Sequence, residues 1–223
     1  MFRTIVAGTD AGAKGRNAVV LARELAWATG ARLVLVAVHP HGPTHPIDLV
    51  RRLRALRNEL APGALGLTVA EASPANALQR VAEQQGADLI VVGAHKRSRL
   101  RRVIESQPGM QVLRGAPHAV AVVPDHGRVL RRLAHIGAVV DDTPESGAAL
   151  ALAGSVARYA GARVTKLAGD EATAALDLLV LGARDVADIR RLVTDVGCPV
   201  LVTPRHAWQP WVPVAAQATA ART

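Results

Sequence analysis

Residues 93–109 have clear potential for binding chemistry, because a glycine at the end of an apolar run is followed by clustered basic residues. The stretch reads GAHKRSRLRRVIESQPG and follows the run ADLIVV, which predicts a buried strand. A glycine at a strand end can open a loop whose backbone N–H groups bind phosphate. Arginine and lysine side chains can hold the same anion by charge. The stretch therefore fits a nucleotide site, a site for another polyanion, or a solvated loop.

Composition narrows the class of protein. Half of the 223 residues are apolar but only 2% are aromatic, which favours helices packed on a sheet of valine and leucine. The single cysteine, Cys198, precludes an internal disulfide and is expected to be a small, partly buried residue. We find no leader and no run of about 20 apolar residues, so we expect a cytoplasmic protein with no membrane span. The net charge is +9, and five of the 27 basic residues lie at positions 96–102.

The chain contains an internal repeat. TIVAGTD, a helical pattern and GARLVLVAV recur as HIGAVVDD, a second helical pattern and GARVTKLAG, so that Asp10 matches Asp141. ADLIVVGA then matches LDLLVLGA, and PHAVAVVP matches CPVLVTP. The offset between the copies falls from 131 (10 to 141) to 89 (93 to 182) and then to 80 (124 to 204). The second copy has therefore lost 42 residues and then 9.

The order of the elements predicts the fold and the place of a site. Strands alternating with helices predict a doubly wound parallel α/β sheet, in which ligands bind beyond the carboxyl ends of the strands where the strand order reverses. Asp10, His39 and Gly93 each follow a predicted strand of the first copy, so we expect them to meet in one crevice. The second copy lacks a basic helix, a short strand and a helix that Ser73 and Pro74 begin.

Taken together, TIVAGTD, GARLVLVAV, ADLIVVGAHK and LRGAPHAVAVVP resemble the universal stress protein family. The resemblance covers residues 2–124 in full and 134–204 in reduced form. It implies a flavodoxin-like fold in two tandem units, the second truncated, which form a pseudo-dimer through their last strands. We expect a complete unit at 1–126, a reduced unit at 127–205 and a tail at 206–223.

The resemblance also implies a non-enzymatic stress-response protein. Many members bind ATP through a loop of Gly, two residues, Gly, nine residues, Gly and then Ser or Thr. That pattern falls on Gly93, Lys96, Ser106 and Gln107, so only the first glycine is kept. The second copy is too short for the loop, which leaves at most one site, for ATP with Mg²⁺. The candidate nucleotide-binding residues are Thr9, Asp10, Val38, Gly93, Ala94, His95, Arg97, Ser106 and Gln107.

Three functions stay open from the sequence. Side chains at Lys96 and Ser106 hinder a backbone cradle, and Pro108 lacks an N–H, so an anion would be held mainly by charge. The first function is nucleotide binding. The second is an interaction module without nucleotide, whose Arg-rich residues 96–102 meet an acidic protein or polyanion. The third is nucleic-acid binding, which the lack of stacking aromatics disfavours.

Neither catalysis nor a metal site is predicted. No nucleophile lies beside a base in the motifs at the strand ends. His39, His41 and His45 lie close together in a Pro-rich loop, but no carboxylate or cysteine pattern accompanies them. Apolar edge strands invite pairing, so a homodimer is a further expected partner.

Overall fold

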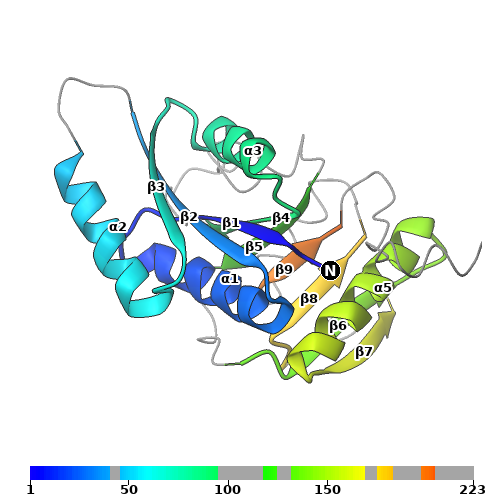
Figure 1. Ribbon diagram of the computed structural model, residues 1–223. Helices are drawn as coiled ribbons and strands as arrows, with labels where there is room; N and C mark the ends of the chain where they lie inside the picture. Colours follow the sequence, from blue (N-terminus) through cyan, green and yellow to red (C-terminus); the bar gives the residue numbers. More distant parts are fainter. Residues whose placement is uncertain (41–45, 95–117, 125–131, 169–174, 183–196, 204–223) are drawn as a thin grey trace, which may run out of the picture.

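The computed structural model describes residues 1–40, 46–94, 118–124, 132–168, 175–182 and 197–203. Its described strands form one nine-stranded sheet with helices on its faces (Figure 1). We call residues 1–124 the first half and residues 132–203 the second half. The first half contains β1 (Thr4–Gly8), the 3-10 helix η1 (Ala13–Gly15), α1 (Arg16–Thr29), β2 (Arg32–His39), α2 (Ile47–Leu60), β3 (Leu65–Ala70), α3 (Pro74–Gln85), β4 (Leu89–Ala94) and β5 (Ala119–Pro124). The second half contains β6 (His135–Val140), α5 (Pro144–Ala160), β7 (Arg163–Ala168), β8 (Leu178–Leu181) and β9 (Val200–Val202).

Two helix ends show how local residues set the bounds, and the start of α3 at Ser73 and Pro74 confirms the prediction from the sequence. α1 ends at Gly30, which adopts a left-handed conformation with φ of 69°, a backbone state that costs glycine little. Ser73 caps α3 and accepts a hydrogen bond from the backbone N–H of Asn76, with Pro74 in the first helical position.

The two halves join through their last strands, as the sequence predicts. The strand order is β3-β2-β1-β4-β5-β9-β8-β6-β7, and β5 pairs with β9 in antiparallel register, with Val120 opposite Val202. The other described pairings are parallel. Read from the junction outward, β9-β8-β6-β7 repeats the order β5-β4-β1-β2. No described strand of the second half takes the place of β3, so the pseudo-dimer has a reduced second unit.

The helices cover the two faces of the sheet unequally. Buried residues of α1, α2 and α5 form one apolar cluster on one face, where α1 also contacts α5. The other face carries a second cluster, to which α3 contributes Ala75, Leu78, Val81 and Ala82. The two clusters consist almost entirely of alanine, valine, leucine and isoleucine, in agreement with the low aromatic content.

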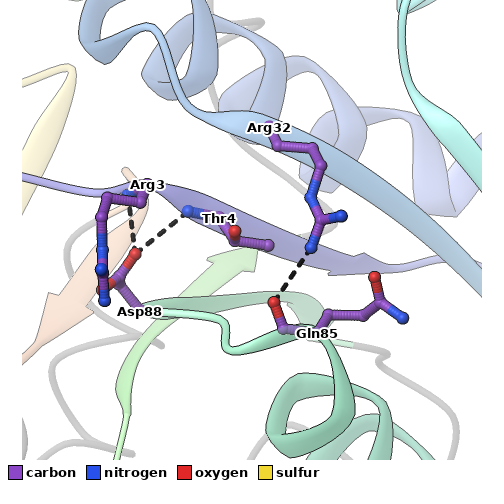
Figure 2. Close-up of polar contacts among 5 residues, drawn as sticks. All are labelled: Arg3, Thr4, Arg32, Gln85 and Asp88. Atoms are coloured by element: carbon purple, nitrogen blue, oxygen red, sulfur yellow. Dashed lines mark hydrogen bonds and ion pairs between the residues drawn. The ribbon is translucent and has the colours of Figure 1, made fainter.

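An aspartate at the amino end of the sheet fixes the start of the first strand. Asp88 Oδ2 accepts the backbone N–H groups of Arg3 at 2.6 Å and Thr4 at 3.0 Å (Figure 2). Asp177, its match in the second half, accepts the N–H groups of Ala134 and His135, both at 2.9 Å. Because these carboxylates bind at the amino ends of β1 and β6, they secure the register and leave the carboxyl ends available for a site.

The second half covers the α3 face of its sheet with leucine side chains. A Cβ atom placed on Gly137 would lie 2.6 Å from Leu176 Cδ1 and 2.9 Å from Leu167 Cδ1. By the repeat offsets, Gly137, Leu167 and Leu176 match Val6, Val36 and Ala87 of the first half. In the second half, two leucines thus replace a valine and an alanine, and they surround a glycine that replaces a valine. The leucines fill part of the space that α3 covers in the first half.

This packing predicts a compensating pair of substitutions. Gly137→Val should lower the free energy of unfolding by about 1–3 kcal/mol, because the added side chain overlaps Leu176. Leu176→Ala alone should destabilise by about 2–5 kcal/mol, because it leaves a cavity. The double variant Gly137→Val with Leu176→Ala restores the Val/Ala pair of the first half. Its loss of stability should therefore be smaller than the sum of the two single losses. Urea unfolding of the three variants measures the coupling, and strictly additive effects would contradict this packing.

Candidate functional site

A cleft opens at the carboxyl ends of the strands of the first half, where the strand order reverses. β1 lies between β2 and β4, and the chain passes from β2 and β3 on one side of β1 to β4 on the other. The cleft has a volume of about 160 Å³. It is lined by Gly8, Thr9, Asp10, Gly15, Val36, Val38, Pro74, Leu78, Val92 and Gly93. This is the place where doubly wound sheets bind ligands.

The lining combines an apolar wall with a polar rim. Val38 and Val92 come from strands β2 and β4, and Leu78 comes from α3 on the face of the sheet. Thr9 and Asp10 supply a hydroxyl and an exposed carboxylate where β1 ends. An apolar wall of this kind suits the face of a flat ring, and a carboxylate accepts hydrogen bonds from amino or hydroxyl groups.

The loop after β1 holds the polar rim in place through its own backbone. Thr9 donates its backbone N–H to Val36 O at 2.9 Å, and its Oγ1 accepts the N–H of Ala11 at 3.1 Å. Asp10 Oδ1 accepts the N–H of Gly12 at 2.9 Å. Ala11 has a φ of 54°, an uncommon conformation for a residue with a side chain. These bonds orient Asp10 at the rim, and its Oδ2 accepts no hydrogen bond from the described part of the chain.

Gly15 makes room for this rim. A Cβ atom on Gly15 would lie 2.7 Å from Asp10 Oδ1 and 3.1 Å from Asp10 N, and it would overlap Thr9 Oγ1. Any side chain here would therefore displace the two polar groups of the cleft. Six lining residues were not predicted from the sequence: Gly8, Gly15, Val36, Pro74, Leu78 and Val92. The repeat gives one indication that this position differs between the halves, because Gly15 matches Ser146 in the second half.

The structure brings together several of the predicted site residues. Thr9, Asp10, Val38 and Gly93 line the cleft. Ala94 pairs with Pro124 at the end of β4 and does not line it. His39 was expected in the crevice, which is wrong: its Nδ1 donates to the adjacent Pro40 O at 3.0 Å, and it is not part of the lining. His95, Arg97, Ser106 and Gln107 lie outside the described residues, as does the basic segment 96–102.

Comparisons with known proteins identify the family. The model of the universal stress protein family matches residues 1–124, more than half of the chain. The chain belongs to the universal stress protein family. No curated protein sequence matches it. The residues of this universal stress protein that match the family model are those of the first half, which contains the cleft.

Solved structures show the same fold. A functionally unknown protein from Pseudomonas aeruginosa PAO1 is 17% identical, with a TM-score of 0.65 over 92% of this chain and 93% of that protein. A universal stress protein from Archaeoglobus fulgidus DSM 4304 is 14% identical, with a TM-score of 0.64 over 91% and 96%. A universal stress protein in complex with cAMP is 22% identical, with a TM-score of 0.48 over 55% and 97%. The first two cover both halves of the chain and support the tandem fold.

In the second half of this universal stress protein, the described residues at the position equivalent to the cleft are closely packed. Gly182, which matches Gly93, lies so close to α5 that a Cβ atom would be 2.7 Å from the Glu145 carbonyl carbon. Ser146, which matches Gly15, is buried and donates its hydroxyl to Asp141 O at 2.6 Å. The first turn of α5 thus occupies the space over Gly182. Because the junction is antiparallel, β6 and β8 run in the opposite direction to β1 and β4, and their carboxyl ends lie on the other side of the sheet from the cleft, at the amino ends of β1 and β4.

Other candidate groups lie apart from the cleft. Cys198 is buried, as predicted, and burial followed by the charge of Asp177 raises the pKa of its thiol to about 12. The thiol therefore stays protonated and is a poor nucleophile. Within the described ranges, histidine, cysteine and acidic side chains form no cluster of three that could hold a metal ion. No helix in these ranges is long and apolar enough to span a membrane.

The space at Gly15 predicts a specific loss. Gly15→Ala should lower the free energy of unfolding by about 1–3 kcal/mol, because its Cβ overlaps Thr9 Oγ1 and crowds Asp10. Gly147→Ala in α5 is the matched control, since a Cβ there meets nothing within 4 Å. It should stabilise by about 0.5–1 kcal/mol through helix propensity. Urea unfolding compares the two, and equal effects would mean that the space beside Asp10 is not restricted.

Proposed function

We propose that this universal stress protein binds one adenine-type nucleotide in the cleft of its first half and acts as a non-enzymatic stress-response protein. The observation that carries the proposal is the cleft itself, at the strand-order reversal, with Asp10 on its rim and an apolar wall behind it. The wall fits a base, and the Asp10 carboxylate can accept hydrogen bonds from a base amino group or a ribose hydroxyl.

The charges of the lining favour one orientation of the nucleotide. Asp10 is the one charged side chain among the described residues that line the cleft, and a carboxylate repels phosphate. We therefore place the base and ribose beside Asp10 and Val38. The phosphates, with Mg²⁺, would extend from Gly93 toward the basic residues that follow it in the sequence, Lys96 and Arg97.

The proposed role is binding without catalysis. A nucleophile needs an adjacent base, and the described lining supplies no histidine, lysine or cysteine beside its one hydroxyl, Thr9 Oγ1. A cytoplasmic location and a homodimer remain predictions from the sequence. An interaction module that meets an acidic partner through residues 96–102 is the second candidate, supported by the cluster of five basic residues there.

Thermal unfolding with nucleotides tests the proposal. ATP, ADP and cAMP are titrated with and without Mg²⁺, and a ligand at about 100 times its dissociation constant should stabilise by about 2.7 kcal/mol. In a chain of this length, that free energy raises Tm by about 5–10 °C. Absence of any shift at millimolar nucleotide would reject nucleotide binding and favour the interaction module.

Two matched substitutions locate the site. Asp10→Asn keeps an oxygen to accept the Gly12 N–H but removes the charge, so it should weaken binding about tenfold. Asp141→Asn makes the same change at the matching position of the second half, where Asp141 Oδ1 accepts the N–H of Thr143 at 3.2 Å. It should leave the nucleotide shift unchanged. An equal loss in both variants would place the ligand elsewhere.

A further inference from the structure

β3 lies at one end of the sheet, and one of its backbone edges is paired with no other strand among the described residues. It pairs with β2 on one side and is the outermost of the described strands of the first half. Its sequence, LGLTVA, contains no charge and no proline. Leu65 is 44% exposed, and Leu67 and Val69 are half-buried. Native proteins usually protect such an edge with charges, proline or a covering element.

The hydrogen bonds to β2 show which backbone groups of β3 point outward. Glu71 N–H donates to His39 O at 2.9 Å, so Glu71 faces β2. Because successive residues of a strand point their backbone groups to opposite sides, residues 65, 67 and 69 also face β2. The N–H and C=O groups of Gly66, Thr68 and Ala70 therefore point to the open edge. No described strand pairs with them.

One stripe of α2 includes a residue that contacts β3. Val50, Arg54 and Arg57 are spaced four and then three residues apart, which places them on one side of the helix. Arg57 Cδ would lie 3.7 Å from a Cβ on Gly66, so Arg57 lies against β3. The helix itself runs beside this strand (Figure 1). The other side of α2 faces α1, where Glu59 pairs with Arg16.

The two arginines of the stripe lack acidic partners in the described part of the chain. Arg54 is exposed and makes no ion pair there. The Arg57 guanidinium donates to the neutral Asn58 Oδ1, at 3.0 Å from Nη2. By contrast, the helix's own acidic residues are engaged with Arg51 and Arg16. The open edge of β3 is therefore flanked by positive charge that the described residues leave unpaired.

We propose that β3 accepts an extended acidic segment of a partner protein as an additional strand. Thr68 and its outward-facing neighbours would hydrogen-bond the backbone of the incoming segment. Alternate side chains of that segment fall on the two faces of the sheet. Those on the α2 face meet Arg54 and Arg57, which selects glutamate or aspartate. Those on the α3 face lie beside Leu65, Leu67 and Val69, which selects valine or isoleucine.

The other outer strand does not offer the same surface. β7 carries exposed Arg163 and Lys166, charges of the kind that discourage strand addition. Pairing of β3 with a second copy of itself would bring two α2 helices together, with like charges at Arg54 and Arg57. Charge complementarity therefore favours an acidic segment over a second copy at this edge.

A synthetic peptide tests the proposal. An eight-residue peptide of alternating glutamate and valine, labelled with a fluorophore, should bind the full chain in an anisotropy titration at low salt. A peptide of alternating lysine and valine should bind at least tenfold more weakly. Binding of the acidic peptide should also weaken as salt is added, because the contacts are exposed. Equal binding of the two peptides, or none by the acidic one, would overturn the proposal.

Matched variants separate strand addition from general attraction. Arg54→Glu with Arg57→Glu should weaken binding of the acidic peptide at least tenfold. Arg51→Glu with Arg52→Glu makes the same change in net charge at positions outside the stripe and should weaken binding less than threefold. Equal losses would reduce the site to non-specific charge. Thr68→Pro removes one outward N–H and should also abolish binding, while Lys166→Pro in β7 should not. A dimer that only Thr68→Pro dissociates would assign the edge to a second copy.

Discussion

The antiparallel pairing of β5 with β9 is the interaction on which the rest of the molecule depends. Each of the six residues of β5 and the three of β9 is buried, and neither strand carries a charge. Left apart, each half would expose an apolar sheet edge, and the α1 and α5 surfaces that meet across the junction would face water. The junction turns two incomplete units into one sheet with a continuous core.

The second half works chiefly as a structural complement to the first. It keeps the strand that pairs with β5, the helix that packs against α1, and the aspartate that fixes the start of its first strand. At its counterpart of the cleft, Glu145 lies against Gly182 and Ser146 replaces a glycine that keeps space open. The second half thus keeps the elements that the shared core requires, and around its counterpart of the cleft it keeps Asp141 and Gly182 but replaces Gly15 by Ser146.

The sequence predicted the fold well because the repeat and the helix caps carry local physical signals. Gly30, Ser73 and Pro74 fix helix ends through their own backbone chemistry, and the matching apolar runs predicted the junction of β5 with β9. The cleft was predicted less completely. The positions of the predicted strand ends are enough to predict Thr9, Asp10, Val38 and Gly93. Leu78 reaches the cleft because α3 packs on the face of the sheet opposite to α1.

Two further misses are local in the chain. His39 follows a strand, but its ring turns back to the adjacent Pro40 carbonyl, a rotamer choice that no spacing encodes. Gly15 matters through the volume it leaves empty beside Asp10, and an absent side chain gives no periodic signal. The position of Leu78 needs coordinates because it depends on residues far apart in the chain. Those of His39 and Gly15 need coordinates because a ring orientation and an empty volume leave no pattern in the residue types.

The contact between Glu145 and Gly182 limits how the protein can respond to a signal. Cooperative binding needs at least two coupled sites, and at the matching position of the second half the described residues Glu145 and Gly182 are in close contact. Occupancy of the first-half cleft within one chain would then rise gradually with ligand concentration, without a threshold. If the proposed ligand binds there, its binding curve for a single chain should be hyperbolic, and a switch-like response would have to arise from association between chains.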